Sequence, residues 1–251
     1  MSTAAVALVV LGCLLAAVLL GRALRRALPE SHLSADTKDV VKLAMGLVAT
    51  MSALVLGLLV SSAKSAYDIK QSEVIQMAAK TAFLDRVLLV YGPEAAQTRA
   101  QFHEAVKEAV QRIWPQATAS AADLIPNLQS GRRLYGDIQA LSPHDEEQRG
   151  LKAEATSLAT QLGEIRSLLA AQSVPSVSMP LLIILVFWLF VILLSFTLFA
   201  PPNTTALFAL IVSAIAVAGA IFLILELDQP FGGLIRISSE PMLNAINQLE
   251  K

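Results

Sequence analysis

Residues 180–200 read PLLIILVFWLFVILLSFTLFA, a stretch without a charged side chain and with only two hydroxyl side chains, Ser195 and Thr197. Each Leu, Ile, Phe or Val favours membrane insertion by about 0.3–0.6 kcal/mol at the bilayer centre, so together they outweigh the two hydroxyls. A helix needs about 20 apolar residues to cross the hydrocarbon core. The stretch therefore predicts a membrane-spanning helix.

Three further apolar runs lie at residues 4–20, 40–61 and 206–225. The first has about the minimum length for a span. We interpret it as an anchor and not as a cleaved secretory segment, because no basic residue precedes it and an arginine cluster follows it. A short turn at residues 201–203 joins the last two runs into an antiparallel hairpin. The sequence thus predicts four transmembrane helices.

The composition agrees with a lipid-facing protein: 55% of residues are hydrophobic and 16% are charged. A net charge of -1 provides no broad basic surface for a phosphate backbone, so no nucleic-acid partner is expected. The single cysteine, Cys13, lies in the first apolar run and cannot form a disulfide within the chain. The sequence lacks a Cys/His metal spacing, a phosphate-binding loop, a dinucleotide fingerprint and a nucleophile elbow. We therefore expect no enzyme, no cofactor and no bound metal.

Between the second and third spans, the apolar pattern changes from continuous to periodic. The second span is predicted to continue as an amphipathic helix to Gly92, and further helices are expected in the segments 93–113 and 128–141. Ser142, Pro143 and Asp145 resemble an N-cap, a first helical proline and an acid at the third position of another helix. The predicted fold is an all-α membrane protein with an all-helical, water-facing domain inserted between the second and third spans.

Four segments follow from this pattern. They are a first helix pair at 1–62, the helical domain and its linker at 63–179, a second transmembrane hairpin at 180–227, and a C-terminal segment at 228–251 that ends in a short amphipathic helix.

The arrangement places both ends of the chain and the helical domain on the same side of the membrane. The basic residues that flank the 21–38 loop are Arg22, Arg25, Arg26, Lys38 and Lys42, and those on the domain side are Lys64, Lys70, Arg166 and Arg236. The arginine cluster after the first span favours a cytoplasmic loop and hence an extracytoplasmic domain. We expect an integral, multi-pass protein of a bacterial inner (plasma) membrane.

Small, weakly polar residues recur at steps of three or four along the second span: Gly46, Thr50, Ala53, Gly57 and Ser61. Lys64 and Asp68 continue this line beyond the span. Small residues at such spacing let helices pack closely in lipid. They also suit a helix that lines a narrow ion path, where hydroxyls replace hydration water. Both interpretations remain open, and the stripe with Lys64 forms the set of pore-lining candidates.

A second candidate site follows the last span, in the sequence ELDQPFGGLIR at residues 226–236. Glu226 and Asp228, together with Asp68, are candidates for recruiting ions at a pore mouth, although carboxylates at the end of a span also act as interfacial anchors. Residues 230–233, which are Pro230, Phe231, Gly232 and Gly233, predict a sharp structural turn. The helix after it, which carries Met242 and Leu249 on one side, suits the membrane interface or a neighbouring subunit.

Three stretches carry a family resemblance: GLVATMSALVLGLLVSSAKSAYD at 46–68, LDRVLLVYGPEAAQTR at 84–99 and ELDQPFGGLIRISSEPM at 226–242. They resemble the bestrophin-like membrane family, which is similar to the bestrophins, a family of pentameric anion channels. The resemblance implies a homo-oligomer, with a pentamer as the expected number, and a second span that lines the pore. It also implies a cytoplasmic helical domain, in conflict with the charge count.

One departure concerns calcium. Bestrophins carry an acidic run just after Pro-Phe-Gly that helps to hold calcium, whereas Gly233-Leu234-Ile235-Arg236 follows Gly232 in this chain. Calcium gating through that segment is therefore not expected.

We predict an oligomeric ion channel, anion-selective by resemblance, whose partners are the lipid bilayer, further copies of the chain and inorganic ions. The alternative is a non-conducting sensor or scaffold whose helical domain binds a ligand or partner. A membrane enzyme using Asp85, Arg86, Tyr91 and Glu94 ranks third, because capping and surface pairing explain these residues equally well.

Overall fold

The computed structural model describes residues 2–29, 34–114, 128–172, 177–201 and 203–249. In these ranges every regular element is helical, and the elements are α1 (Thr3–Ala27), α2 (Ala35–Tyr91), the 3-10 helix η2 (Pro93–Ala95), α3 (Ala96–Ile113), α4 (Leu128–Ala140), α5 (Glu146–Ala171), α6 (Met179–Phe199), α7 (Thr204–Leu227) and α8 (Glu240–Leu249). The predicted all-α class is confirmed. Four of the helices, α1, α2, α6 and α7, are long and apolar enough to cross a membrane.

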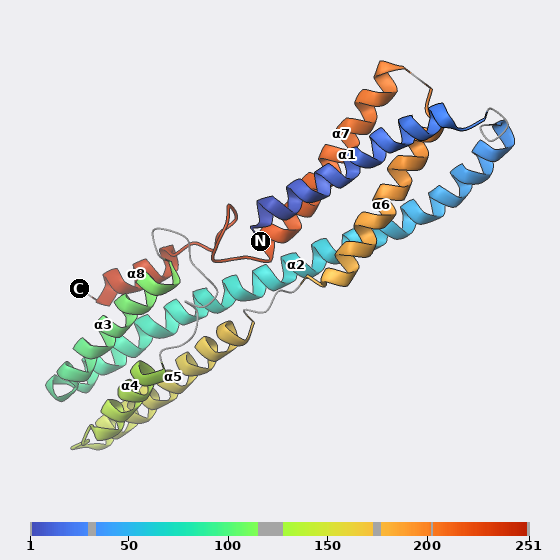
Figure 1. The fold of residues 1–251 in the computed structure, drawn as a ribbon. Coiled ribbons are helices and arrows are strands. Elements are labelled where there is room, and N and C mark those ends of the chain that lie inside the picture. The colour runs from blue at the N-terminus through green and yellow to red at the C-terminus, as the bar shows by residue number, and fades with distance from the viewer. Residues whose placement is uncertain (1, 30–33, 115–127, 173–176, 202, 250–251) are drawn as a thin grey trace. The chain divides into compact units, whose positions relative to one another are not determined.

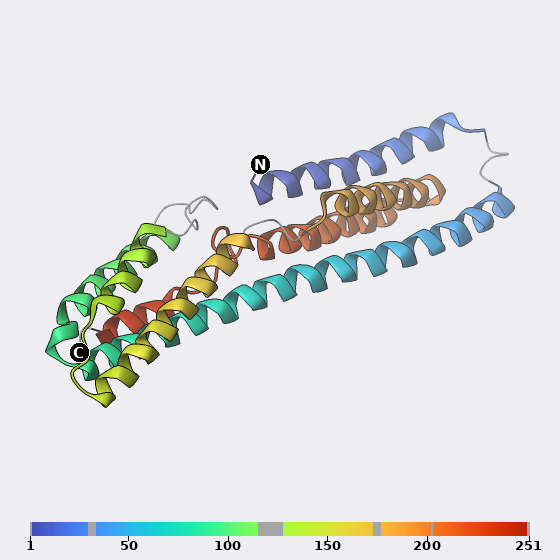
Figure 2. The same cartoon turned by 90° about the horizontal axis from the view of Figure 1, so that it is seen from below.

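The second helix is the longest element and is unbroken in both views (Figures 1 and 2). Its 57 residues correspond to about 85 Å at 1.5 Å per residue, whereas a span needs about 30 Å. The remainder of α2 therefore extends well past the apolar segment. It ends at Tyr91 because Gly92 has φ of 117°, a backbone conformation that favours glycine.

The chain forms two compact units, which we describe separately. The membrane unit comprises Met1–Ala66 and Ser176–Asp228, and the bundle unit comprises Tyr67–Pro175 and Gln229–Lys251. Helix α2 contributes residues to both.

Helices α1, α6 and α7 pack together in the membrane unit (Figure 1). Leu14, Leu193 and Ile221 are buried in their shared core. Gly21 allows the close approach of α1 to α6, because a Cβ at this position would lie 2.8 Å from Thr197 Cβ. A second cluster joins α2 to α6 and α7 through Leu59, Ala63, Leu185 and Ile224.

The bundle unit has its own core, built from the C-terminal half of α2, from α3, α4 and α5, and from the end of the chain. Leu84, Phe102, Ile138 and Leu158 are buried in it. Helix α8 adds Met242 and Ala245 to the same core, and Ile246 packs against it. Its apolar side is therefore used within the chain, and the expectation that it suits the membrane interface or a neighbouring subunit is wrong.

Helix α5 begins three residues later than the sequence suggested. Asp145, and not Ser142, is the N-cap: its Oδ1 accepts a hydrogen bond from Gln148 N at 2.7 Å. The Gln148 side chain accepts in turn from His144 N at 2.8 Å and donates to Tyr91 O at 3.1 Å. The Asp145 and Gln148 side chains thus satisfy two backbone donors, Gln148 N and His144 N, in a variant of the capping box, which explains why the helix begins at Glu146.

Asp145→Ala is expected to lower the free energy of unfolding of the bundle unit by about 1 kcal/mol, the usual cost of losing an N-cap side chain. The decrease is measured as a shift in the chemical denaturation midpoint. Glu154→Ala, at an exposed position within α5, is the matched control and should leave the midpoint nearly unchanged. Equal midpoint shifts in the two variants would argue against the capping role.

Candidate functional site

All six pore-lining candidates lie on α2 and are exposed within the single chain: Gly46, Thr50, Ala53, Gly57, Ser61 and Lys64. At about 100° per residue they fall within an arc of roughly 80° on the helix surface. They form one continuous stripe, which we call the small-residue stripe.

The packed face of α2 lies elsewhere on the helix. Leu59 and Ala63 are buried against α6 and α7, and they are centred roughly 140° away from the small-residue stripe. A Cβ built at Gly46 or Gly57 meets no atom within 4 Å. Close packing within the described part of the chain therefore does not account for the small side chains.

One polar group on the stripe is already engaged. The Thr50 hydroxyl donates to Gly46 O at 2.9 Å, within the same helix. Its oxygen keeps lone pairs that can accept from water or contact a cation, but its proton is not directed outward. Among the stripe residues, Lys64 carries the positive charge.

The carboxylates proposed to recruit ions differ in their surroundings. Glu226, near the end of α7, is only 2% exposed, and Thr3 Oγ1 donates a hydrogen bond to its Oε1. Asp228 is half-buried at the C-cap of α7. Asp68, on the bundle-unit part of α2, is exposed. Within the chain, the Glu226 carboxylate therefore links the first turn of α1 to α7 and is covered from solvent.

The Pro-Phe-Gly-Gly segment forms a turn in the bundle unit. Gly232 N donates to Gln229 O at 3.1 Å, and Gly233 adopts φ of 85°, which favours glycine. The Phe231 ring meets Trp114 edge to face, with centroids 6.0 Å apart. Trp114 Nε1 also donates to Ile237 O at 2.9 Å. The turn is thereby held against the end of α3.

Sequence reasoning missed a buried charge cluster between α2 and α3. Arg99 Nε and Nη2 donate to the two carboxylate oxygens of Asp85 at 2.6 and 2.9 Å. His103 Nε2 lies 2.6 Å from Asp85 Oδ1, and Arg99 Nη2 also donates to Leu249 O of α8 at 3.2 Å. We call Asp85, Arg99 and His103 the bundle triad.

The hydrogen bonds within the bundle triad shift the pKa values of Asp85 and Arg99. Burial by itself would raise the pKa of the Asp85 carboxyl, but the hydrogen bonds and charges of Arg99 and His103 outweigh it and lower that pKa below its ordinary value. The hydrogen bond that Arg99 donates to Asp85 likewise raises the pKa of Arg99. The carboxylate is therefore held ionised as a structural group.

The enzyme-like grouping considered from the sequence does not assemble. Asp85 is buried in the triad, whereas the neighbouring Arg86 is exposed on another face of α2. Tyr91 is buried, and burial with the charges of Glu94 and Asp145 raises the pKa of its hydroxyl. The described residues contain no group of three or more His, Cys, Asp or Glu side chains that could hold a metal ion.

The bundle unit also contains a cavity of about 550 Å³. Most of its lining is apolar and includes Met77, Phe102 and Val106, with Arg132 and Arg166 as the charged members. Burial and the nearby charge of Arg112 lower the pKa of Arg166. The cavity is large enough for a small organic ligand.

Comparison with known proteins supports the fold independently. The Bestrophin-like domain family matches residues 12–242. Two solved structures of variants of a bacterial Bestrophin homolog from Klebsiella pneumoniae are 16% identical to this chain, with TM-scores of 0.64 and 0.66. In each case the alignment covers 96% of this chain, and it covers 97% and 99% of the respective structures. No curated protein matches the sequence.

Proposed function

Since the chain belongs to the bestrophin-like family, we propose that it assembles into an oligomeric ion channel with the small-residue stripe of α2 around the pore. The observation that carries this proposal is the position of the stripe. It lies away from the face of α2 that packs against α6 and α7, and its glycines meet no other part of the chain within 4 Å.

The residues beside the stripe support a ring of α2 helices. Leu47, Leu54 and Leu58 lie on one flank and are 66%, 71% and 60% exposed. In a ring, large apolar flanks contact the neighbouring subunits, while small side chains at the axis leave room for an ion. A pentamer is the number that the family resemblance implies.

Two observations point to opposite charges for the permeant ion. Family resemblance and Lys64 favour anions. The Thr50 hydroxyl favours cations, because its proton is donated to Gly46 O and its lone pairs remain available. We propose an anion-selective channel in a bacterial inner membrane, with Lys64 acting at one end of the stripe.

Current across a planar bilayer under a KCl gradient tests the proposal. We expect unitary currents that reverse near the chloride equilibrium potential. Lys64→Glu should move the reversal potential toward that of potassium, because it replaces a ring of positive charges with a ring of negative charges.

Arg133→Glu makes the same charge change at an exposed position on α4 and should leave the reversal potential in place. Currents that reverse near the potassium potential in the unmodified protein would reject anion selectivity. Silence from folded, assembled protein would reject the channel itself.

The bundle cavity favours a second candidate, a non-conducting sensor whose helical domain binds a small ligand. The two candidates differ in assembly: the channel requires a ring of several copies, whereas a sensor of this kind is expected to be a dimer. Native mass spectrometry of the detergent-purified protein distinguishes them by the number of chains per particle.

A further inference from the structure

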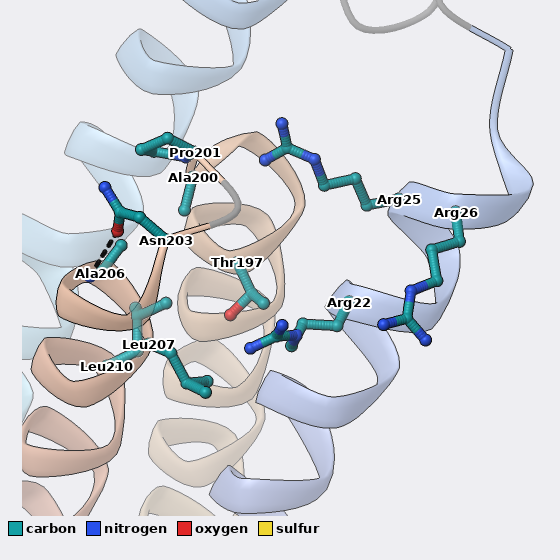
Figure 3. Close-up of a pocket in the computed structure, with 10 residues that line it drawn as sticks. All are labelled: Arg22, Arg25, Arg26, Thr197, Ala200, Pro201, Asn203, Ala206, Leu207 and Leu210. Atoms are coloured by element: carbon teal, nitrogen blue, oxygen red, sulfur yellow. Dashed lines mark hydrogen bonds between the residues drawn. The ribbon is translucent and has the colours of Figure 1, made fainter.

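A second cavity lies in the membrane unit, where α1 ends beside the connection between α6 and α7 (Figure 3). Its volume is about 190 Å³. Since about 10–15 Å³ of such space admits one water molecule, the cavity has room for a group of several atoms. Arg22, Arg25 and Arg26 line it from the last two turns of α1. We call it the arginine pocket.

The arginines are oriented differently within the pocket. Arg22 and Arg25 extend from α1 toward the end of α6 and the start of α7, whereas the exposed Arg26 side chain lies along α1, farther from those two helices (Figure 3). Arg25 Nη1 is buried, and no hydrogen-bond partner for it occurs among the described residues. A buried guanidinium donor without an acceptor is costly, because the protein must forgo its hydration. The pocket therefore presents a donor that an anion would satisfy.

The charge of the pocket is one-sided. Its described lining contains no Asp or Glu side chain. The N-terminus of α7 adds the positive end of a helix dipole, next to Asn203, whose Oδ1 accepts from Ala206 N at 2.7 Å. Basic residues at the C-terminal end of α1 are favourable for that helix by themselves. This accounts for the exposed Arg26, but not for a buried and unpaired Arg25 Nη1.

The other end of the lining is apolar. Leu207 and Leu210 of α7 border the cavity opposite Arg22 (Figure 3). Beside the pocket, the apolar runs of α1 and α6 end and that of α7 begins. The ends of apolar runs mark the depth at which the lipid headgroups of a bilayer begin. Guanidinium groups bind phosphate oxygens through paired hydrogen bonds. We propose that the arginine pocket binds the phosphate of an anionic phospholipid, with Arg22 and Arg25 as ligands and Leu207 and Leu210 against the start of an acyl chain.

Native mass spectrometry of the full chain in detergent tests this assignment. Phosphatidylglycerol and phosphatidylcholine with the same acyl chains are added in equal amounts. We expect the unmodified protein to retain phosphatidylglycerol in preference, and the double variant Arg22→Gln/Arg25→Gln to lose this preference by about tenfold, since each arginine contributes charged hydrogen bonds. Arg133→Gln, which removes an exposed charge from α4, should retain it.

Two further arms separate the sources of the phosphate and guard against misfolding. Inorganic phosphate that stabilises the unmodified protein against heat, without any preference between the two lipids, would reject the lipid assignment in favour of a free oxyanion. Equal retention of both lipids without such stabilisation would reject the pocket as a phosphate site. If the double variant does not fold, Arg25→Lys replaces it: loss of the paired hydrogen bonds should weaken retention, and unchanged retention would contradict the proposal.

Discussion

Gly57→Trp is expected to abolish ion current while the oligomer remains assembled. Gly57 is exposed within the chain, and a Cβ at this position would meet no atom within 4 Å beyond the adjacent backbone of α2, so we expect the protomer to keep its fold. In a ring, several indoles converge on the axis and fill the space through which an ion passes. Thr50→Trp, two turns earlier on the same stripe, should have the same effect. Single-channel recording measures the loss.

The control for this prediction is Phe187→Trp. Phe187 lies on α6 and is 61% exposed, so the change adds a tryptophan to an exposed surface of a different spanning helix. The Phe187→Trp variant should conduct like the unmodified protein. Particle size is measured for every variant, because loss of assembly would also silence the protein. Normal current through assembled Gly57→Trp and Thr50→Trp would place the pore elsewhere.

Asp85→Ala is expected to lower the free energy of unfolding of the bundle unit by about 2–4 kcal/mol. Removing one member of a buried ion pair typically costs about 3–5 kcal/mol, and the cost is reduced here because the Arg99 side chain remains 23% exposed. The change leaves Arg99 and His103 without their shared acceptor. Chemical denaturation in detergent gives the value, and Glu104→Ala, at an exposed position on α3, is the control.

The same triad predicts the direction of a pH effect. The pKa of Asp85 is lower in the folded protein than the ordinary value of about 3.9. Its stabilising contribution is therefore complete above that ordinary value and is lost as pH falls through the lower folded pKa. Asp85→Asn should flatten this acid dependence, and an unchanged acid dependence in the variant would assign it to other carboxylates.

Much of the fold follows from patterns that a single chain contains. The four spans are continuous apolar runs, and Gly92 ends α2 because its positive φ suits glycine. The start of α5 was misplaced because Ser142 and Asp145 are both acceptable N-caps; the position of Gln148, three residues after Asp145, decides between them. The partner of α8 was also misjudged, since an amphipathic pattern reveals an apolar side but not what covers it.

The candidate site was harder to predict, because a helical pattern identifies a face of a helix but not what that face contacts. Helical periodicity identifies the small-residue stripe, but only the burial of Leu59 and Ala63 shows that the chain packs through another face of α2. The bundle triad did leave a trace: Asp85 and Arg99 lie seven residues before and after Gly92. Two helices that reverse direction at a turn bring such positions level with each other, so opposite charges there predict a pair.

The contribution of α8 to the bundle core has a consequence for the order of events during synthesis. Met242 and Ala245 complete a core whose other helices have all been made once Ala171 is reached, and α6 and α7 are made in between. At about 5–20 residues per second, translation of the 70 residues between Ala171 and Met242 takes on the order of ten seconds. During this interval the nascent bundle exposes the apolar surface that α8 later covers. Folding of the bundle is thus completed only after the ribosome has produced the last two spans.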